Sequence, residues 1–190
     1  MKKARCFLLL FSLMISFSAC SSKMDKADDI YSKIHDGYYD IDSYTAECVV
    51  TSFTSGGENS YEMQISYNKP EKFHRVVSDE MTLEIYDDKT IVSKGDTVIE
   101  TDSKPSDMPI FLETFFKSYY ESENTAMTVS ATSKSNSIVL ECEAVNSPEI
   151  NGYMKLWIDK KSVKPQKMQI YDDKDNMHTQ IEFEKFNFEK

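Results

Sequence analysis

The sequence predicts an α+β fold in which a single curled antiparallel sheet, a half-barrel, carries two helices on its concave face. Three observations lead to this class. Most apolar residues alternate with polar ones at a period of two, which is typical of antiparallel strands with one buried and one wet face. Two segments instead repeat at helical spacing. The strands are too amphipathic for a sandwich of fully buried sheets, so one sheet and its helices must share the core.

The first helix is expected at about residues 26–36. Asp25 can cap it, and Gly37 is a natural place for it to stop. Its apolar face repeats at i, i+3, i+4, i+7 and i+11. This face consists of Ala27, Ile30, Tyr31, Ile34 and Tyr38.

The second helix is expected within residues 106–122, with Asp107 as its cap and Pro109 in its first turn. One side of this helix is strongly apolar and must be buried against the sheet, a ligand or a partner. That side therefore either completes the protein's own core or lines an apolar pocket. Its residues are Phe111, Leu112, Phe115, Phe116 and Tyr119, preceded by Met108.

Nine or ten strands are expected, about six between the helices and about four after the second. The alternation is clearest over residues 61–67, 81–85, 154–158 and 181–183. Turn-forming sequences separate the strands at residues 55–59, 87–90, 94–96 and 172–176.

The N-terminus has the pattern of an exported protein. Lys2, Lys3 and Arg5 precede an apolar run over residues 7–17. These are the charged start and the apolar centre of a signal peptide. The run is too short to cross a bilayer as a finished helix, which takes roughly 20 residues.

The residues after this run, Ser-Ala-Cys, resemble the bacterial lipobox. The resemblance implies cleavage after Ala19 and a diacylglyceryl thioether on Cys20. We therefore expect a lipoprotein signal peptide at residues 1–19, a lipidated tether at 20–25 and a single domain at 26–190. The mature protein would be exported and anchored in the membrane through its lipid.

The predicted mature chain is strongly acidic. The full sequence has 22 Lys and Arg against 32 Asp and Glu, a net charge of −10. Three of the basic residues and none of the acidic ones lie in residues 1–19, which leaves 19 against 32 and a net charge of −13. Such a chain does not bind nucleic acid by neutralising phosphates, and anionic lipid head groups repel it.

Two cysteines remain in the predicted domain. Cys48 and Cys142 both alternate with small or apolar residues and look like core positions on strands. We expect two buried free thiols. A disulfide between them is the alternative, since the chain is exported and the number of remaining cysteines is even.

The sequence contains no catalytic or cofactor motif that we recognise. It has no Gly-x-Ser-x-Gly, no His-Glu-x-x-His, and no phosphate or dinucleotide loop. His35, His74 and His178 do not pair at metal-ligand spacing. We therefore expect no enzyme activity, no cofactor and no metal.

Two aromatic residues are candidates for a partner interface. Trp157 lies between the inward-pointing Leu156 and Ile158, and Tyr171 follows the inward-pointing Ile170. Both should therefore point to the wet face of the sheet. Aromatic residues on a wet face are typical of interfaces, but they also pack against each other across a hairpin.

Two segments resemble the LolA/LolB lipoprotein-carrier superfamily. Residues 67–79, YNKPEKFHRVVSD, resemble its strand entry, in which Lys/Arg-Pro leads to a Phe-Arg pair. Residues 156–176, LWIDKKSVKPQKMQIYDDKDN, resemble one of its hairpins. His74 stands where the superfamily has arginine, and Asn176 where it has glycine. The order of these segments and helices implies the half-barrel described above.

The lipobox, the acidic chain and the LolA-like pattern together resemble the GerS-type germination lipoproteins of clostridial spores. This resemblance implies a non-catalytic partner of a CwlD-like N-acetylmuramoyl-L-alanine amidase, active in cortex modification and germination. It also implies a place on the outer face of a spore or forespore membrane. A homodimer is left open. The alternative function is a LolA/LolB-like carrier or sensor of the acyl chains of lipids or lipoproteins.

Overall fold

The computed structural model describes residues 28–102, 109–129, 136–144 and 152–189. The chain divides into two compact units, Met1–Gly37 and Tyr38–Lys190. The predicted signal peptide, the lipidated tether and the Asp25 cap lie outside the described residues.

A helix over residues 28–38 occupies the described end of the first unit. An ion pair one turn apart, Lys33 Nζ to Asp29 Oδ2 at 2.7 Å, lies on its surface. The predicted stop before Gly37 is wrong, because Gly37 stays helical and does not take the left-handed conformation that ends many helices.

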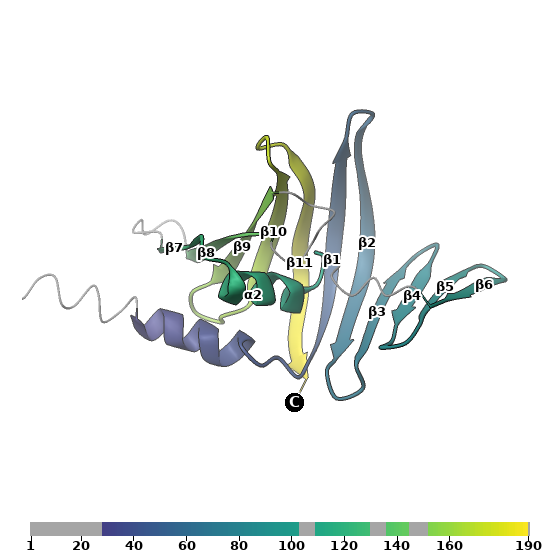
Figure 1. Ribbon diagram of the computed structural model, residues 1–190, viewed down its shortest axis with the longest axis horizontal. Helices are drawn as coiled ribbons and strands as arrows, with labels where there is room; N and C mark the ends of the chain where they lie inside the picture. Colours follow the sequence, from purple (N-terminus) through teal and green to yellow (C-terminus); the bar gives the residue numbers. More distant parts are fainter. Residues whose placement is uncertain (1–27, 103–108, 130–135, 145–151, 190) are drawn as a thin grey trace, which may run out of the picture. The chain divides into compact units, whose positions relative to one another are not determined.

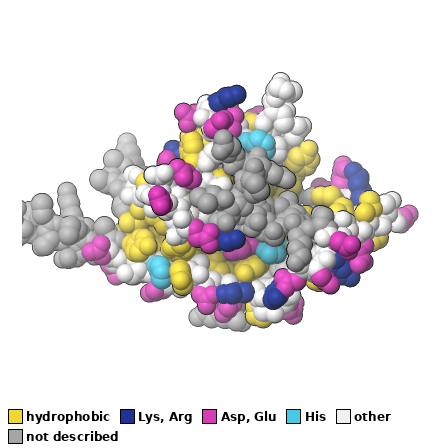
Figure 2. Space-filling view, in the orientation of Figure 1, with side chains coloured by type: hydrophobic (Ala, Val, Ile, Leu, Met, Phe, Trp, Pro, Cys, Tyr) yellow, Lys and Arg dark blue, Asp and Glu magenta, His cyan; other side chains and the backbone are white. Residues whose placement is uncertain are grey.

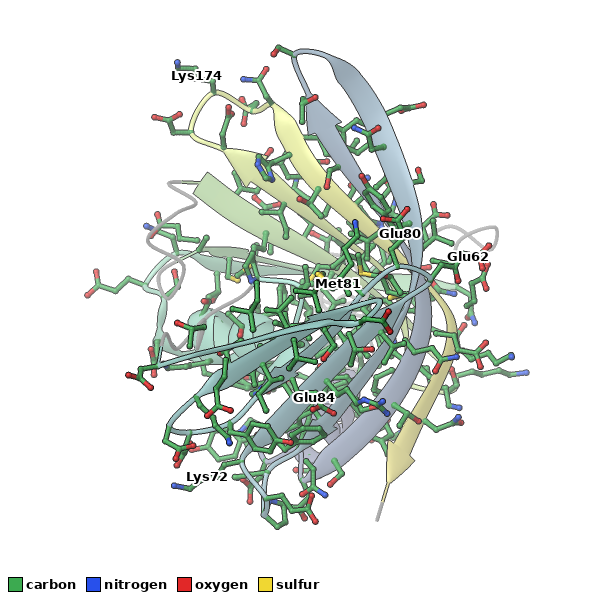
Figure 3. All side chains as sticks on the ribbon, turned by 90° about the vertical axis from the view of Figure 1, so that its right-hand side faces the viewer. Glu62, Lys72, Glu80, Met81, Glu84 and Lys174 are labelled. Carbon is green, nitrogen blue, oxygen red and sulfur yellow. The ribbon has the colours of Figure 1, made fainter. Side chains whose placement is uncertain are left out.

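The second unit is built on one antiparallel sheet, which Figures 1 and 3 show to be curled and open. The described residues form eleven strands in the order β6-β5-β4-β3-β2-β1-β11-β10-β9-β8-β7. The first six are β1 (Ser43–Thr54), β2 (Gly57–Asn68), β3 (Phe73–Ser78), β4 (Thr82–Ile85), β5 (Thr90–Lys94) and β6 (Thr97–Thr101). The last five are β7 (Thr125–Val129), β8 (Ser137–Glu143), β9 (Gly152–Asp159), β10 (Pro165–Asp172) and β11 (Met177–Glu189).

The topology is two meanders joined at the centre of the sheet. Strands β1 to β6 run outward to one edge, and α2 (Leu112–Glu121) follows them in the chain. Strands β7 to β11 then return from the other edge, and β11 pairs with β1. The predicted fold class is confirmed, with one or two strands more than expected.

The core is clearest where alternation is strict. Over residues 138–142 of β8, 154–158 of β9 and 168–170 of β10, every second side chain is at most 1% exposed, and those between them point to the outer face. The predicted inward residues of β9, Met154, Leu156 and Ile158, are all fully buried. The other inward residues of this region are Ile138, Leu140, Cys142, Met168 and Ile170.

A bulge changes the pattern in β11. The register between β1 and β11 shifts at Cys48, where Glu184 has no residue opposite it. Ile181 and Phe183 share the inward face before the bulge, as predicted. Beyond the bulge the buried residue is Phe186, which unbroken alternation would have placed outside.

The alternation of β2 does not produce the burial that it predicts. Ile65 is buried, but Tyr61 is 51% exposed, and Met81 beside β4 is also exposed. The reason is coverage. Figure 1 shows the β1–β2 hairpin reaching well beyond α2, so α2 does not cover its far end.

Helix α2 is shorter than predicted. It begins at Leu112, and Pro109 lies in a turn before it rather than in its first turn. Phe111 is the N-cap residue and its side chain makes no cap, while Asp107 lies outside the described residues. Helix α2 packs on β8, where the Cys142 Sγ lies 4.0 Å from the Phe115 carbonyl oxygen. The predicted apolar set of this segment, Phe111, Leu112, Phe115, Phe116 and Tyr119, is buried.

Both cysteines of the second unit are buried and free. Burial raises the pKa of each thiol, Cys48 and Cys142, from 9.0 to about 12. The thiolate, which is the reactive form, is therefore scarce at neutral pH.

We expect iodoacetamide to leave Cys48 and Cys142 unmodified in the native protein at pH 8 and to modify both in guanidinium, as read from peptide masses. Because the folded pKa lies above the unfolded one, the thiols cost no stability below pH 9 and destabilise the fold as pH rises toward 12. Cys48→Ala should lose less stability over that range. Rapid native labelling of either peptide would contradict the burial.

Candidate functional site

The start of α2 is held by a tyrosine from the central strand of the sheet. Tyr44 on β1 is fully buried, and its hydroxyl accepts a hydrogen bond from the Leu112 backbone N–H at 3.2 Å. The same hydroxyl donates to Glu113 Oε2 at 3.0 Å. Since the first N–H groups of a helix lack partners within the helix, Tyr44 supplies the cap that Phe111 cannot.

Glu113 joins this tyrosine to a histidine on β3. The second oxygen of its carboxylate, Oε1, lies 2.5 Å from Nε2 of His74. The His74 ring in turn lies 4.5 Å from the ring of Phe111 and 4.9 Å from that of Tyr67. A carboxylate in the first turn of a helix is also favoured by the helix dipole.

An open cleft of about 730 Å³ adjoins this network. We call it the aromatic cleft. Three parts of the second unit form it: the segment before β1, the β2–β3 turn with its flanking strands, and one side of α2. Its lining residues are Tyr38, Tyr39, Ile41, Tyr67, Lys69, His74, Glu113, Thr114, Phe116, Lys117, Tyr120 and Glu121.

The aromatic rings of the cleft support one another. Tyr38 stacks on Phe116 with ring centroids 4.4 Å apart, and Tyr39 meets Tyr120 edge to face at 5.3 Å. The Tyr38 hydroxyl donates to the carbonyl of Val163 at 2.5 Å. These contacts hold Tyr38, Tyr39 and their neighbouring rings in place along the cleft.

Hydrogen bonds also fix the β2–β3 turn to the segment before β1. The Lys69 backbone N–H donates to the Asp42 carbonyl at 2.7 Å, and the Lys69 ammonium pairs with the Asp40 carboxylate. This hydrogen bond to Asp40 raises the pKa of Lys69. Lys69, which lines the cleft, is therefore held beside a carboxylate that does not line it.

The tyrosines around Glu113 remain neutral. Burial, followed by the nearby Glu113 carboxylate, raises the pKa of Tyr67 to about 12 and that of Tyr44 well above its usual range. Both hydroxyls therefore act as hydrogen-bonding groups at physiological pH.

Two polar groups of the cleft are already engaged with each other. His74 and Glu113 in its lining lie in hydrogen-bond contact, and Glu113 also accepts a hydrogen bond from Tyr44. In the described part of the chain, no three His, Cys, Asp or Glu side chains gather closely enough to hold a metal ion. Exposed aromatic rings beside paired charges are typical of protein and ligand binding surfaces.

The two aromatic residues singled out from the sequence lie elsewhere, on the outer face of β9 and β10. Lys167 Nζ lies 4.1 Å from the centroid of the Trp157 ring. Tyr171 stacks on Tyr153 across the hairpin, with centroids 4.7 Å apart and planes 9° apart. The structure thus places Trp157 and Tyr171 on one face, as predicted, and gives each a partner within the sheet.

Sequence reasoning missed the network at the cleft. It considered His74 as a metal ligand and as a departure from the superfamily arginine, and it gave Tyr44 and Glu113 no role. Their sequence separations of 39 and 69 residues leave no local signal. The predicted lipidation site Cys20 lies outside the described residues. Within the described ranges, no helix combines the length and apolar character needed to cross a membrane.

Comparison with known proteins assigns the family. A model of the family described as "Sporulation protein YdcC-like" matches residues 1–190. The chain belongs to the YdcC-like sporulation protein family. No curated protein matches the sequence of this YdcC-like protein.

Solved structures similar to the YdcC-like chain share its fold at low identity. An uncharacterized conserved protein from Thermus thermophilus is 9% identical, with a TM-score of 0.52 over 86% of this chain and 88% of that one. LprF from Mycobacterium bovis is 12% identical, with a TM-score of 0.50 over 87% and 97% of the two chains.

A chain in the structure of the CwlD amidase from Clostridioides difficile in complex with the GerS lipoprotein is 18% identical. Its TM-score is 0.48 over 85% of this chain and 95% of that one.

The cap at α2 can be tested with Tyr44→Phe. The variant leaves the Leu112 N–H without its acceptor and Glu113 Oε2 without the donor hydroxyl of Tyr44, so we expect a loss of about 1–3 kcal/mol in the free energy of unfolding. Urea denaturation followed by circular dichroism measures it. The control is Tyr61→Phe, the same chemical change at a half-exposed site, which should stay within about 0.5 kcal/mol of the wild type. Equal losses would contradict the cap.

Proposed function

We propose that this chain is a membrane-anchored, non-catalytic binding partner of a spore cortex peptidoglycan amidase, and that the amidase docks at the aromatic cleft. The cleft carries the proposal, because exposed aromatic rings and charged side chains line it together, as they do at many protein interfaces. Membership of a sporulation family supports the setting. The amidase, rather than another spore enzyme, follows from the resemblance of the sequence to GerS-type lipoproteins.

The rim of the cleft has the character of an interface hot spot. Tyr39 is 63% exposed, yet its ring is already held against Tyr120, so little side-chain freedom is lost on binding. Lys117 is exposed on the same side of α2. An aromatic anchor beside charged groups suits a partner with an apolar contact surrounded by polar ones.

A binder without catalytic groups acts by choosing between states of its partner. If the domain binds the active, zinc-loaded amidase better than the inactive form, it shifts the population toward activity. A tenfold shift needs a difference in affinity of about 1.4 kcal/mol. By reciprocity, zinc must then tighten the binding of the amidase to this domain by the same factor.

If the amidase docks at the aromatic cleft, substitutions in the cleft should weaken its binding selectively. Calorimetric titration of a CwlD-like amidase into the full chain in detergent measures this affinity. Tyr39→Ala should weaken binding about thirtyfold, the loss typical of a 2 kcal/mol hot spot. Tyr61→Ala removes a similarly exposed tyrosine that does not line the cleft, so it should bind like the wild type. Equal affinities of both variants and the wild type would place the amidase elsewhere, and no binding by the wild type would reject the amidase.

A second function has one observation in its favour. The volume of the cleft, about 730 Å³, lies in the range of small-molecule sites, roughly 300–1,000 Å³. A carrier or sensor of acyl chains would retain phospholipid or lipoprotein acyl chains in about a one-to-one ratio. Mass spectrometry of the purified protein distinguishes the two functions, because the amidase partner needs no bound lipid.

Anchoring is tested separately through Cys20. Labelled palmitate should enter the wild-type protein in cells and not Cys20→Ala, because the thioether forms on the Cys20 sulfur. Cys142→Ala is the control and should be labelled like the wild type, since this cysteine is buried in the fold. Equal labelling of the Cys20 variant and the wild type would remove the lipoprotein assignment.

A further inference from the structure

Strand β6 forms an open edge with an apolar surface. It pairs with β5 on one side, and within the described residues no strand pairs with the other side. Val98 is 66% exposed and Ile99 57% exposed. Figure 2 shows hydrophobic side chains exposed among charged ones over the region of β4 to β6.

The edge of β6 lacks the usual protection against pairing with another chain. Edge strands commonly carry lysine, proline or a bulge. Strand β6, with the sequence TVIET, has neither residue, and its ladder with β5 is regular. Its one charge, Glu100, is paired with Lys89 at 3.3 Å.

Ile99 is also the last member of an apolar row that starts in the core. The row crosses the strands from Ile65 through Val76, Leu83 and Val92 to Ile99. Ile65 and Val76 are buried, Leu83 and Val92 are half-buried, and Ile99 is exposed. A second strand beside β6 would continue this row.

The β5–β6 turn determines which backbone groups face the open edge. Lys94 and Thr97 are opposite each other across the two-residue turn Gly95-Asp96, and such a turn closes with a hydrogen-bonded pair. Every second residue from Thr97 onward therefore directs its N–H and C=O to β5. The groups of Val98 and Glu100 point outward.

We propose that β6 pairs antiparallel with β6 of a second copy of this chain, about a two-fold axis at Ile99. Val98 and the partner's Glu100 then exchange backbone hydrogen bonds, and the reverse pair does the same. Ile99 faces the partner's Ile99 in the close, non-hydrogen-bonded position. Within the paired strands, Glu100 lies opposite the partner's Val98 rather than the partner's Glu100, and the apolar rows of the two copies join at Ile99.

This proposal does not rest on the proposed function. The surface is a short edge, and a five-residue pairing falls at the weak end of specific interfaces. Trapping the dimer with a disulfide is therefore the direct test. Opposed residues in the non-hydrogen-bonded position have Cα atoms about 4.5 Å apart, within reach of a disulfide. The two copies of residue 98 lie two residues apart along the strands, roughly 8 Å, which is too far.

The test uses the full chain in membranes, oxidised with copper phenanthroline and resolved on non-reducing gels. Ile99→Cys should form at least about ten times more disulfide dimer than Val98→Cys. The wild type sets the background from its own cysteines, of which Cys48 and Cys142 are buried. Equal yields from the two variants, or background yields from both, would overturn the proposal.

A charge at the axis gives the second measurement. Ile99→Lys sets two ammonium groups against each other and should abolish the dimer seen by analytical ultracentrifugation in detergent. Met81→Lys is the matched control and should leave the dimer intact, since this exposed residue, labelled in Figure 3, lies outside β6. A wild type that is monomeric at about 100 μM, or a dimer that survives Ile99→Lys, would overturn the pairing at β6.

Discussion

The hydroxyl group of Tyr44 is the interaction on which the site depends. It joins β1, the strand where the two meanders meet, to the first residues of α2, the helix that follows one meander and precedes the other. Because the hydroxyl both caps Leu112 and donates to Glu113, it fixes the position of the helix and the direction of the carboxylate. His74 then takes its place against the free oxygen of Glu113. The positions of Glu113 and His74 in the wall of the aromatic cleft thus follow from the hydrogen bonds that join α2 to β1.

Much of the fold could be predicted from the sequence. The correctly predicted strands share one physical property, which is that their alternating apolar side chains are buried. Strand β8 packs against α2, β9 and β10 follow it in the sheet, and the alternation of all three translates into burial in their central residues. At Tyr61 the same alternation fails, since α2 does not reach that end of the hairpin. The bulge at Glu184 is set by the pairing of two strands, and one strand's sequence cannot show it.

The candidate site was predictable only in pieces. The buried aromatic face of α2 has a helical period and was found. The Tyr44–Glu113–His74 network was not, because it joins three elements that come together only when the sheet has formed. Trp157 and Tyr171 were placed on the correct face, but their rings are engaged by Lys167 and Tyr153 of the same hairpin. Periodicity gives the face of a residue and says nothing about which neighbours reach it.

The pairing of β1 with β11 has a consequence for how the chain is made. Strand β1, which begins at Ser43, pairs with β11, which ends at Glu189. One of the longest ladders of the sheet therefore joins the two ends of the second unit. Each meander can form from local hairpins, but the sheet has no continuous centre until the last strand has been synthesised. Contacts of such long sequence separation form slowly. Until then, β1 has a partner only on the side of β2, and the half-finished sheet has an open edge in what later becomes its middle.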